Sequence, residues 1–152
     1  DPRSPLKSVK ILIVGLGGAG KAAAAAAESL GMEVVRMNRT VRDSKTRSLN
    51  EFRKYSRESD IIIYNIPEAI PELKELTDSD FNTATRKHIL EANYKNPSFD
   101  KNMTDRMIAA NPDARYVSGE TWLLYQALTG YELFTGEKPD PIKMAEVISG
   151  SR

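Results

Sequence analysis

Residues 9–37 read VKILIVGLGGAGKAAAAAAESLGMEVVRM, and the order of elements within them indicates the fold. The apolar run at residues 9–14 is typical of a strand covered on both faces in a parallel sheet. A helix is expected over residues 17–30, because six consecutive alanines favour helix and Gly31 can close it as a C-cap. A second strand is expected over residues 33–37. Strand, helix and strand with such short connections predict a right-handed βαβ unit and therefore a parallel sheet.

Downstream segments continue the alternation of strands and helices. Further strands are expected in three runs, at residues 60–64, 88–92 and 116–117. Helices are expected at residues 103–110, from Gly119 onward and at residues 142–148, with one short helix inside the polar stretch 38–57. Pro67 and Pro71 predict a loop after the third strand.

The composition limits the classes of function. The 152 residues, 40% of them hydrophobic, can bury one substantial core, and a net charge of +1 gives no overall field that would attract nucleic acid or a membrane surface. With no cysteine and one histidine, we expect neither disulfides nor a metal site. No apolar stretch approaches the roughly 18 residues of a membrane span, and no signal peptide is recognisable. The sequence therefore predicts a cytoplasmic protein that binds neither nucleic acid nor membrane.

The first residues differ in character from the rest. Residues 1–8 carry no initiator Met and lead through Pro and Ser into the first strand, so we expect a linker from a missing N-terminal domain. Residues 9–152 are expected to form a single domain that includes the C-terminal helices.

A glycine-rich loop lies between the first strand and the first helix. Residues 15–20 read GLGGAG, which has the spacing G-x-G-x-x-G. Gly15 permits the tight turn, Gly17 lets the backbone approach a pyrophosphate, and Gly20 lets the helix lie close to the strand. Free N–H groups at the start of the helix would hold the phosphates. The fold class is therefore α/β, a single three-layer domain with a Rossmann-like doubly wound parallel sheet that binds a dinucleotide; the alternative is a tight turn with no ligand.

The end of the second strand indicates which dinucleotide the loop would bind. NAD-binding units place Asp or Glu about 20 residues after the glycines, where the carboxylate bonds the ribose hydroxyls. This chain has Asn38, Arg39 and Thr40 there instead. An acid would repel a 2′-phosphate, whereas an arginine can meet it bidentately and stack on the adenine. The sequence therefore predicts NADP, with Arg42 as a second phosphate contact and Lys45 adding to a local cationic pocket; the alternative is a solvated basic loop.

Several segments together resemble the cofactor-binding domain of the shikimate dehydrogenase family. They are GLGGAGKA at residues 15–22, NRT at 38–40, DIIIYN at 60–65, Tyr94, GETWLLYQA at 119–127 and FTGEKPD at 134–140. Each is common alone, so the specificity of the resemblance lies in their combination along nearly the whole chain.

The resemblance assigns residues to the cofactor and to the substrate. The expected cofactor residues, with Arg42 from the basic loop, are Gly15, Leu16, Gly17, Gly18, Ala19, Asn38, Arg39, Thr40, Arg42, Asn65, Ile66, Ala92 and Gly119. Tyr94 and Gln126 are expected to face the substrate; the alternative for Gln126 is a polar residue on an exposed helix face. No catalytic residue is expected in this chain, because the family's catalytic Lys and Asp come from a separate N-terminal substrate-binding domain, which is the expected partner together with shikimate or 3-dehydroshikimate.

The chain departs from the family pattern at several positions. Ile66 and Pro67 stand where the family has Ala and Thr or Ser, Glu91 where it has Asp, and Thr121 where it has a second glycine. Trp122 stands where the family often has Met, and we expect it in core or domain-interface packing, with a cofactor contact as the alternative. The carboxylates after the third strand, expected on a solvated loop and helix face with a metal site or acid–base pair as the alternative, are Glu68, Glu72, Glu75, Asp78 and Asp80.

The resemblance implies NADPH-dependent reduction of 3-dehydroshikimate to shikimate, a step of aromatic amino acid biosynthesis, with no turnover by this chain alone. Hydride transfer requires donor and acceptor carbons about 3 to 3.5 Å apart and a proton donor in reach, which the substrate domain would supply. Two alternatives remain: a quinate/shikimate-type dehydrogenase of broader specificity, and a non-catalytic NADP-sensing module.

Overall fold

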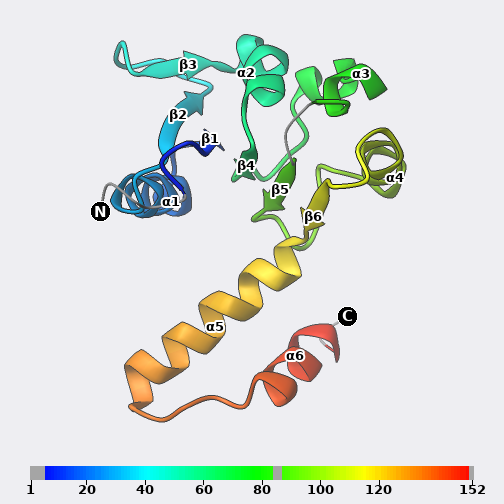
Figure 1. The fold of residues 1–152 in the computed structure, drawn as a ribbon. Coiled ribbons are helices and arrows are strands. Elements are labelled where there is room, and N and C mark those ends of the chain that lie inside the picture. Colours follow the sequence, from blue (N-terminus) through cyan, green and yellow to red (C-terminus); the bar gives the residue numbers. More distant parts are fainter. Residues whose placement is uncertain (1–5, 84–86, 151–152) are drawn as a thin grey trace.

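A computed structural model describes residues 6–83 and 87–150, so the first five residues of the expected linker lie outside the described residues. Its centre is a six-stranded sheet in the order β3-β2-β1-β4-β5-β6 (Figure 1). The strands are β1 (Lys10–Val14), β2 (Glu33–Asn38), β3 (Thr46–Ser48), β4 (Ile61–Tyr64), β5 (His88–Glu91) and β6 (Arg115–Val117). Every neighbouring pair is parallel. This is the strand order of a doubly wound dinucleotide-binding sheet, so the predicted fold class is confirmed.

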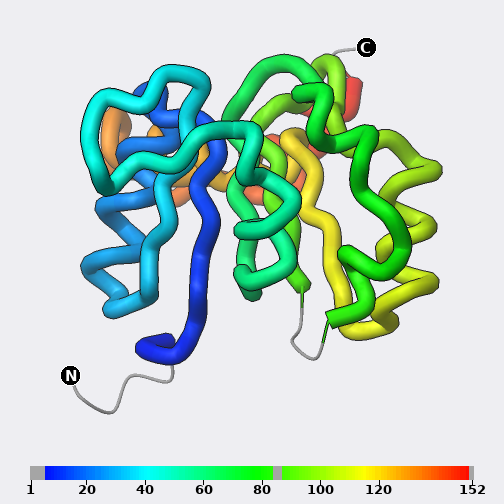
Figure 2. The backbone as a smooth tube through the Cα atoms, turned by 90° about the horizontal axis from the view of Figure 1, so that it is seen from above, coloured from blue at the N-terminus to red at the C-terminus, as the bar shows by residue number. Residues whose placement is uncertain are grey.

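Within the described residues, six α-helices and two 3₁₀ turns connect or follow the strands. The helices are α1 (Gly18–Ser29), α2 (Phe52–Glu58), α3 (Asp78–Phe81), α4 (Lys101–Ala110), α5 (Gly119–Thr135) and α6 (Pro141–Gly150), and the 3₁₀ turns are η1 (Leu49–Glu51) and η2 (Pro71–Glu75). Figure 1 shows α2, α3 and α4 on one side of the sheet and α1 and α5 on the other, and Figure 2 shows the same layers from above. Within residues 6–83 and 87–150, no helix combines the length and the apolar composition needed to cross a membrane.

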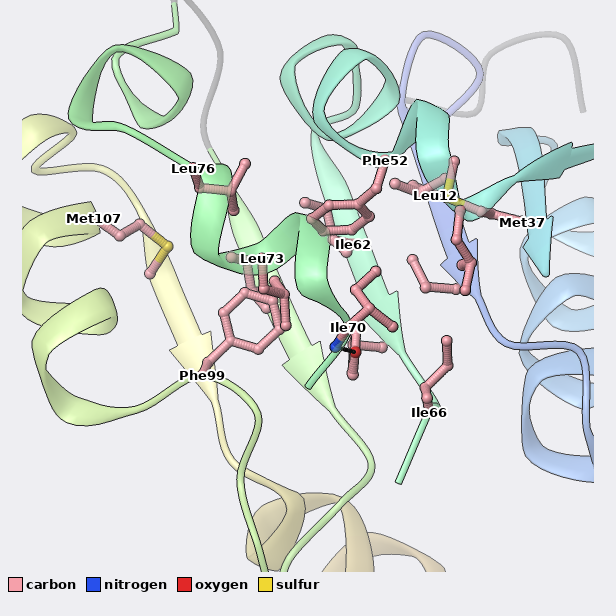
Figure 3. Close-up of a cluster of buried hydrophobic side chains, with 14 of the residues drawn as sticks. Leu12, Met37, Phe52, Ile62, Ile66, Ile70, Leu73, Leu76, Phe99 and Met107 are labelled. Carbon is pink, nitrogen blue, oxygen red and sulfur yellow. Dashed lines mark hydrogen bonds between the residues drawn. The ribbon is translucent and has the colours of Figure 1, made fainter. Parts of the chain in front are cut away.

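The two faces of β1 explain why its sequence is continuously apolar. Leu12 (Figure 3) and Val14 belong to the core cluster that contains side chains of α2, α3 and α4, whereas Ile11 and Ile13 pack against α1 on the opposite face. Leu12, Ile13 and Val14 have no exposed surface at all. Burial of each such side chain contributes about 1.5–3 kcal/mol, so the central strand anchors both layers.

Helix α5 leaves the sheet soon after it begins. Among its residues only Gly119 is fully buried, and its C-terminal part exposes Leu133 and Phe134, by 78% and 92% respectively. Helix α6 turns back along α5 and buries none of its residues (Figure 1). The sheet and helices α1 to α4 therefore hold the compact core, and the last two helices form an arm beside it.

One strand and one helix were not predicted. The edge strand β3 reads Thr46-Arg47-Ser48 and pairs with β2 alone. As a short strand at the edge of the sheet it contains no apolar run, so the sequence has no local signal that predicts it. Helix α3 has four residues and begins at a capping box, in which Thr77 and Asp80 satisfy each other's backbone N–H groups.

A buried lysine ties β5 to the end of α2. Lys87 is 1% exposed, and its ammonium donates to the carbonyls of Ser56, Arg57 and Ser59, at 3.2 Å for Arg57 and 2.6 Å for Ser59. These are carbonyls at a helix C-terminus, which have no partner inside the helix. Burial lowers the pKa of Lys87 from 10.5 to about 8.

We expect Lys87→Met to lower the free energy of unfolding by about 2–4 kcal/mol, because it leaves buried carbonyls without a donor. The folded pKa lies below the unfolded one, so the unfolded chain binds a proton that the folded chain has released between pH 8 and 10.5. The stability of the original protein, relative to the variant, should therefore rise through that range. Urea unfolding at pH 7 and pH 10 measures both effects, and equal stability of the two proteins would contradict the role given to Lys87.

Candidate nucleotide site at the carboxyl edge of the sheet

The predicted cofactor residues follow the carboxyl ends of the parallel strands. They lie in the loops after β1, β2, β4 and β5, in the last residue of β2 and in the first residues of α1 and α5. The order of the sheet reverses between β1 and β4, which are hydrogen-bonded neighbours although β2 and β3 lie between them in sequence. In open α/β sheets a ligand binds in the crevice beyond the strands at such a switch point. Gly15 and Asn65 follow the two strands at this switch point and lie side by side.

The glycine loop has the geometry that its spacing predicts. Gly15 has a φ of 88°, a left-handed conformation that favours glycine, and its N–H donates to the carbonyl of Met37 at 2.9 Å. A Cβ on Gly20 would lie 1.9 Å from the carbonyl oxygen of Gly15. Gly20 therefore allows α1 to approach β1, and Gly15 makes the turn between them.

The loop leaves room for a phosphate group. A Cβ placed on Gly17 or Gly18 would meet no atom within 4 Å. Gly17 is the N-cap of α1 and gives it no side-chain cap, and no acidic residue lies in the first turn. The first N–H groups of a helix have no partner within the helix, and its dipole favours an anion at this end, so an anion could bind over the uncapped turn.

Asn38 and Asn65 border the same loop. The Asn38 amide oxygen accepts from Leu16 N–H at 3.4 Å, and its nitrogen donates to the Thr40 carbonyl at 3.3 Å, so Asn38 ties the glycine loop to the end of β2. The Oδ1 atom of Asn65 is buried and has no hydrogen-bond partner. A buried acceptor without a donor costs about 1–3 kcal/mol, and a bound nucleotide could supply that donor. The open glycines and this acceptor both fit a dinucleotide.

The end of β2 faces the loop that follows β4 across a small cavity. The cavity has a volume of about 440 Å³, and both Arg39 and Glu68 line it. The guanidinium of Arg39 donates to the Glu68 carboxylate, and both side chains are mostly exposed. Thr40 and Arg42 are exposed as well. Arg39 is therefore at the predicted place, but it has an acidic partner that the sequence did not predict.

The other carboxylates after β4 are not all solvated. Asp80 is 2% exposed, and Arg53 Nε donates to its Oδ1 at 3.0 Å. Burial raises the pKa of Asp80, but hydrogen bonds from Arg53 and Thr77 outweigh it and hold the pKa below its ordinary value. The expectation of a solvated face is wrong for Asp80, because this carboxylate caps α3 from inside the core. Among the described residues, no three His, Asp or Glu side chains come together as metal ligands.

The residues predicted for the nicotinamide end contribute mainly backbone. Ile66 is 8% exposed and its side chain belongs to the core (Figure 3), so it leaves its main chain as the part that could contact a cofactor. Ala92 N–H already donates to the carbonyl of Tyr64 at 2.9 Å. Gly119 begins α5, and a Cβ there would lie 2.4 Å from the carbonyl of Asn93. Glycine at 119 therefore lets α5 start in contact with the loop after β5.

Tyr94 and Gln126 do not share a cavity. Tyr94 lines a cleft of about 1090 Å³ with Lys95 and Lys101, between the loop after β5 and helices α5 and α6. Gln126 lines a separate groove of about 870 Å³ beside α5, whose walls include Leu90 and Trp122. Trp122 also packs against the core on the α1 side of the sheet. Within the described part of the chain, the two predicted substrate residues thus lie in different hollows.

Glu91, which stands where the family has Asp, holds the loop after β5 through hydrogen bonds. It is fully buried, and its carboxylate accepts from Ser98 N–H at 2.5 Å, from Phe99 N–H at 3.3 Å and from the Tyr116 hydroxyl at 2.7 Å. Burial, followed by this hydrogen bond, raises the pKa of Tyr116. Glu91 therefore fixes the loop that carries Tyr94. The sequence shows an acid at the end of a strand, but it does not show that the hydrogen-bond partners of this acid are backbone N–H groups seven and eight residues later.

Known proteins resemble both the nucleotide-binding part and the whole chain. A family model described as the NAD-binding domain of D-isomer specific 2-hydroxyacid dehydrogenases matches residues 2–90. No curated protein sequence gives a significant match. The solved structure of shikimate 5-dehydrogenase from Thermus thermophilus with shikimate is similar with a TM-score of 0.66 at 24% identity, covering 97% of this chain and 55% of that one.

Two further solved structures are also similar to this chain. Quinate dehydrogenase from Corynebacterium glutamicum with NAD matches 98% of this chain and 57% of its own, with a TM-score of 0.69 at 18% identity. A glycerate dehydrogenase related protein from Thermoplasma acidophilum matches 74% of this chain and 41% of its own, with a TM-score of 0.58 at 20% identity. At these identities the likeness shows the fold, so the resemblance to shikimate dehydrogenases is confirmed at that level. The chain spans little more than half the length of the shikimate and quinate dehydrogenases.

Proposed function

The chain belongs to the family of NAD-binding domains of D-isomer specific 2-hydroxyacid dehydrogenases. Within this dinucleotide-binding fold, we propose that it is the NADP(H)-binding domain of a shikimate-type dehydrogenase. The observation that carries the proposal is the open glycine loop at the switch point, with Arg39 in place of an acid at the end of β2. A pyrophosphate would lie over Gly17 and Gly18, and the adenosine would extend toward Arg39. The nicotinamide end would lie beyond β4 and β5, beside Asn65 and Ala92.

The choice of NADP rests on charge at the end of β2. An NAD-binding unit places a carboxylate there to accept from both ribose hydroxyls. Asn38 instead binds the glycine loop, and Arg39 is the first charged side chain after it. A guanidinium bonds a phosphate bidentately, which supports a preference for the 2′-phosphate of NADP.

The shikimate type is supported by the C-terminal part of the chain. The glycerate dehydrogenase related structure matches 74% of the chain, whereas the shikimate and quinate dehydrogenase structures match 97% and 98%. The segments at residues 119–127 and 134–140, which resemble the shikimate dehydrogenase family, lie in α5 and in the turn that follows it. The reaction we propose for the parent protein is NADPH-dependent reduction of 3-dehydroshikimate to shikimate, with proton transfer supplied by a substrate-binding domain. A D-2-hydroxy acid substrate is the second candidate, and the family model favours it.

The cofactor proposal is tested by calorimetric titration with NADPH and NADH. Hydrogen bonds to charged groups contribute about 1.5–3 kcal/mol, so we expect Arg39→Ala to weaken NADPH binding by about 10- to 100-fold. The NADH dissociation constant should change by less than about twofold, because NADH has no 2′-phosphate. Equal losses for the two nucleotides would contradict the proposed role of Arg39.

The substrate proposal is tested on the full-length parent protein. Oxidation of shikimate, quinate and a D-2-hydroxy acid such as D-glycerate is followed by NADPH absorbance, with the isolated chain assayed in parallel. Turnover of shikimate by the full-length protein and none by the isolated chain is the expected result. Turnover of the D-2-hydroxy acid alone would support the second candidate, and nucleotide binding without any turnover would indicate a sensing module.

A further inference from the structure

The cavity at the adenosine end of the site contains more negative than positive charge. Arg39 is the one cation among the described residues that line it, against the carboxylates of Glu68 and Glu72. The side chains of Arg39 and Glu68 are 70% and 63% exposed, so water and salt screen their ion pair. A 2′-phosphate carries between one and two negative charges near neutral pH, and in this cavity it would meet a guanidinium that is already paired.

Hydrogen bonds from the side chains of Tyr64 and Asn93 hold the loop that carries Glu68. The hydroxyl of Tyr64, a fully buried residue at the end of β4, donates to the Glu68 carbonyl at 2.7 Å and accepts from Ile70 N–H at 3.1 Å. Burial raises the pKa of Tyr64 to about 12, so the hydroxyl keeps its proton. The amide of Asn93 donates to the Pro67 carbonyl at 2.9 Å. Glu68 is thus held at the cavity by bonds on both sides of its own position.

We propose that Glu68 sets the cofactor preference of this site by holding Arg39 in the nucleotide-free chain. This rests on the proposed function. A nucleotide with a 2′-phosphate has to displace the Glu68 carboxylate from Arg39, whereas a nucleotide with a 2′-hydroxyl leaves the ion pair intact. Glu68 therefore reduces the advantage of NADPH over NADH that Arg39 would otherwise give.

The test is Glu68→Gln, which keeps the size of the side chain and removes its charge. An exposed ion pair is a weak competitor, so we expect NADPH to bind about threefold to fivefold more tightly, with NADH unchanged within about twofold. The matched control is Glu132→Gln on α5, which makes the same change in net charge at an exposed position remote from the cavity. An unchanged ratio of the two dissociation constants in Glu68→Gln, or an equal shift in Glu132→Gln, would overturn the proposal.

The double variant separates this inference from the proposed function. In an Arg39→Ala background, Glu68→Gln should change the NADPH dissociation constant by less than about twofold, because no guanidinium remains to be released. An equal gain in both backgrounds would overturn the role of the ion pair. If NADPH binding depends on Arg39 and not on Glu68, the inference fails while the proposed function stands; if the original protein binds no NADPH, both fail.

Discussion

Replacing Gly17 with alanine is expected to weaken NADPH binding by about 100-fold, or about 2.8 kcal/mol, while leaving the fold intact. Gly17 has φ −70° and ψ −166°, an extended conformation that alanine also adopts. No atom lies within 4 Å of the added Cβ, so the methyl group meets only the space where a pyrophosphate would lie. Alanine is a poorer N-cap than glycine, and the free energy of unfolding should fall by no more than about 1 kcal/mol.

Calorimetric titration measures the NADPH dissociation constant of Gly17→Ala, and urea unfolding measures its free energy of unfolding. Loss of NADPH binding at nearly unchanged stability would place the ligand over the glycine loop. Undiminished NADPH binding by a folded Gly17→Ala protein would contradict that placement.

The adjacent change Gly20→Ala is expected to act on the fold instead. Its Cβ would lie 1.9 Å from the carbonyl oxygen of Gly15 and 3.0 Å from the carbonyl carbon. Neither atom belongs to a flexible side chain, so relief requires α1 to move away from β1. We expect the free energy of unfolding to fall by about 3 kcal/mol, with nucleotide binding lost as a consequence.

Gly18→Ala provides the comparison for Gly20→Ala. It lies in the same first turn of α1, and its Cβ would meet nothing within 4 Å. Its stability should stay within about 0.5 kcal/mol of the original protein or rise slightly, because alanine is the better helix former. Equal stability of the two variants, measured by urea unfolding, would mean that α1 does not depend on Gly20 for its approach to the sheet.

The sequence predicts those parts of the fold that are specified by residues close together in the chain. The strand at β1 is apolar at every position from Ile11 to Val14 because both of its faces are buried, and the glycine spacing directly encodes the turn and the close helix approach. The edge strand β3 has no such signal, since its polar residues pair on one side only. It is identified only when the position of β2 is known.

The sequence predicts which loops form the site. It does not predict which side chains from different loops pair with each other. Arg39 and Glu68 are 29 residues apart and meet because the strand order places the loops of β2 and β4 on either side of β1. The partners of Lys87 and Glu91 are largely backbone groups of other elements. A charged residue in an apolar run gives no indication of such partners before the chain is folded.

Binding of a pyridine dinucleotide at the glycine loop can be observed in a titration of the ¹⁵N-labelled chain with NADPH, followed residue by residue through its backbone amide resonances. We predict saturable shifts at Gly17, Gly18 and Ala19, at Arg39 and at Asn65, which together trace the carboxyl edge from β2 to β4. Shifts confined to the cleft around Tyr94 and Lys101, or no saturable shift at all, would contradict binding of the dinucleotide at this loop.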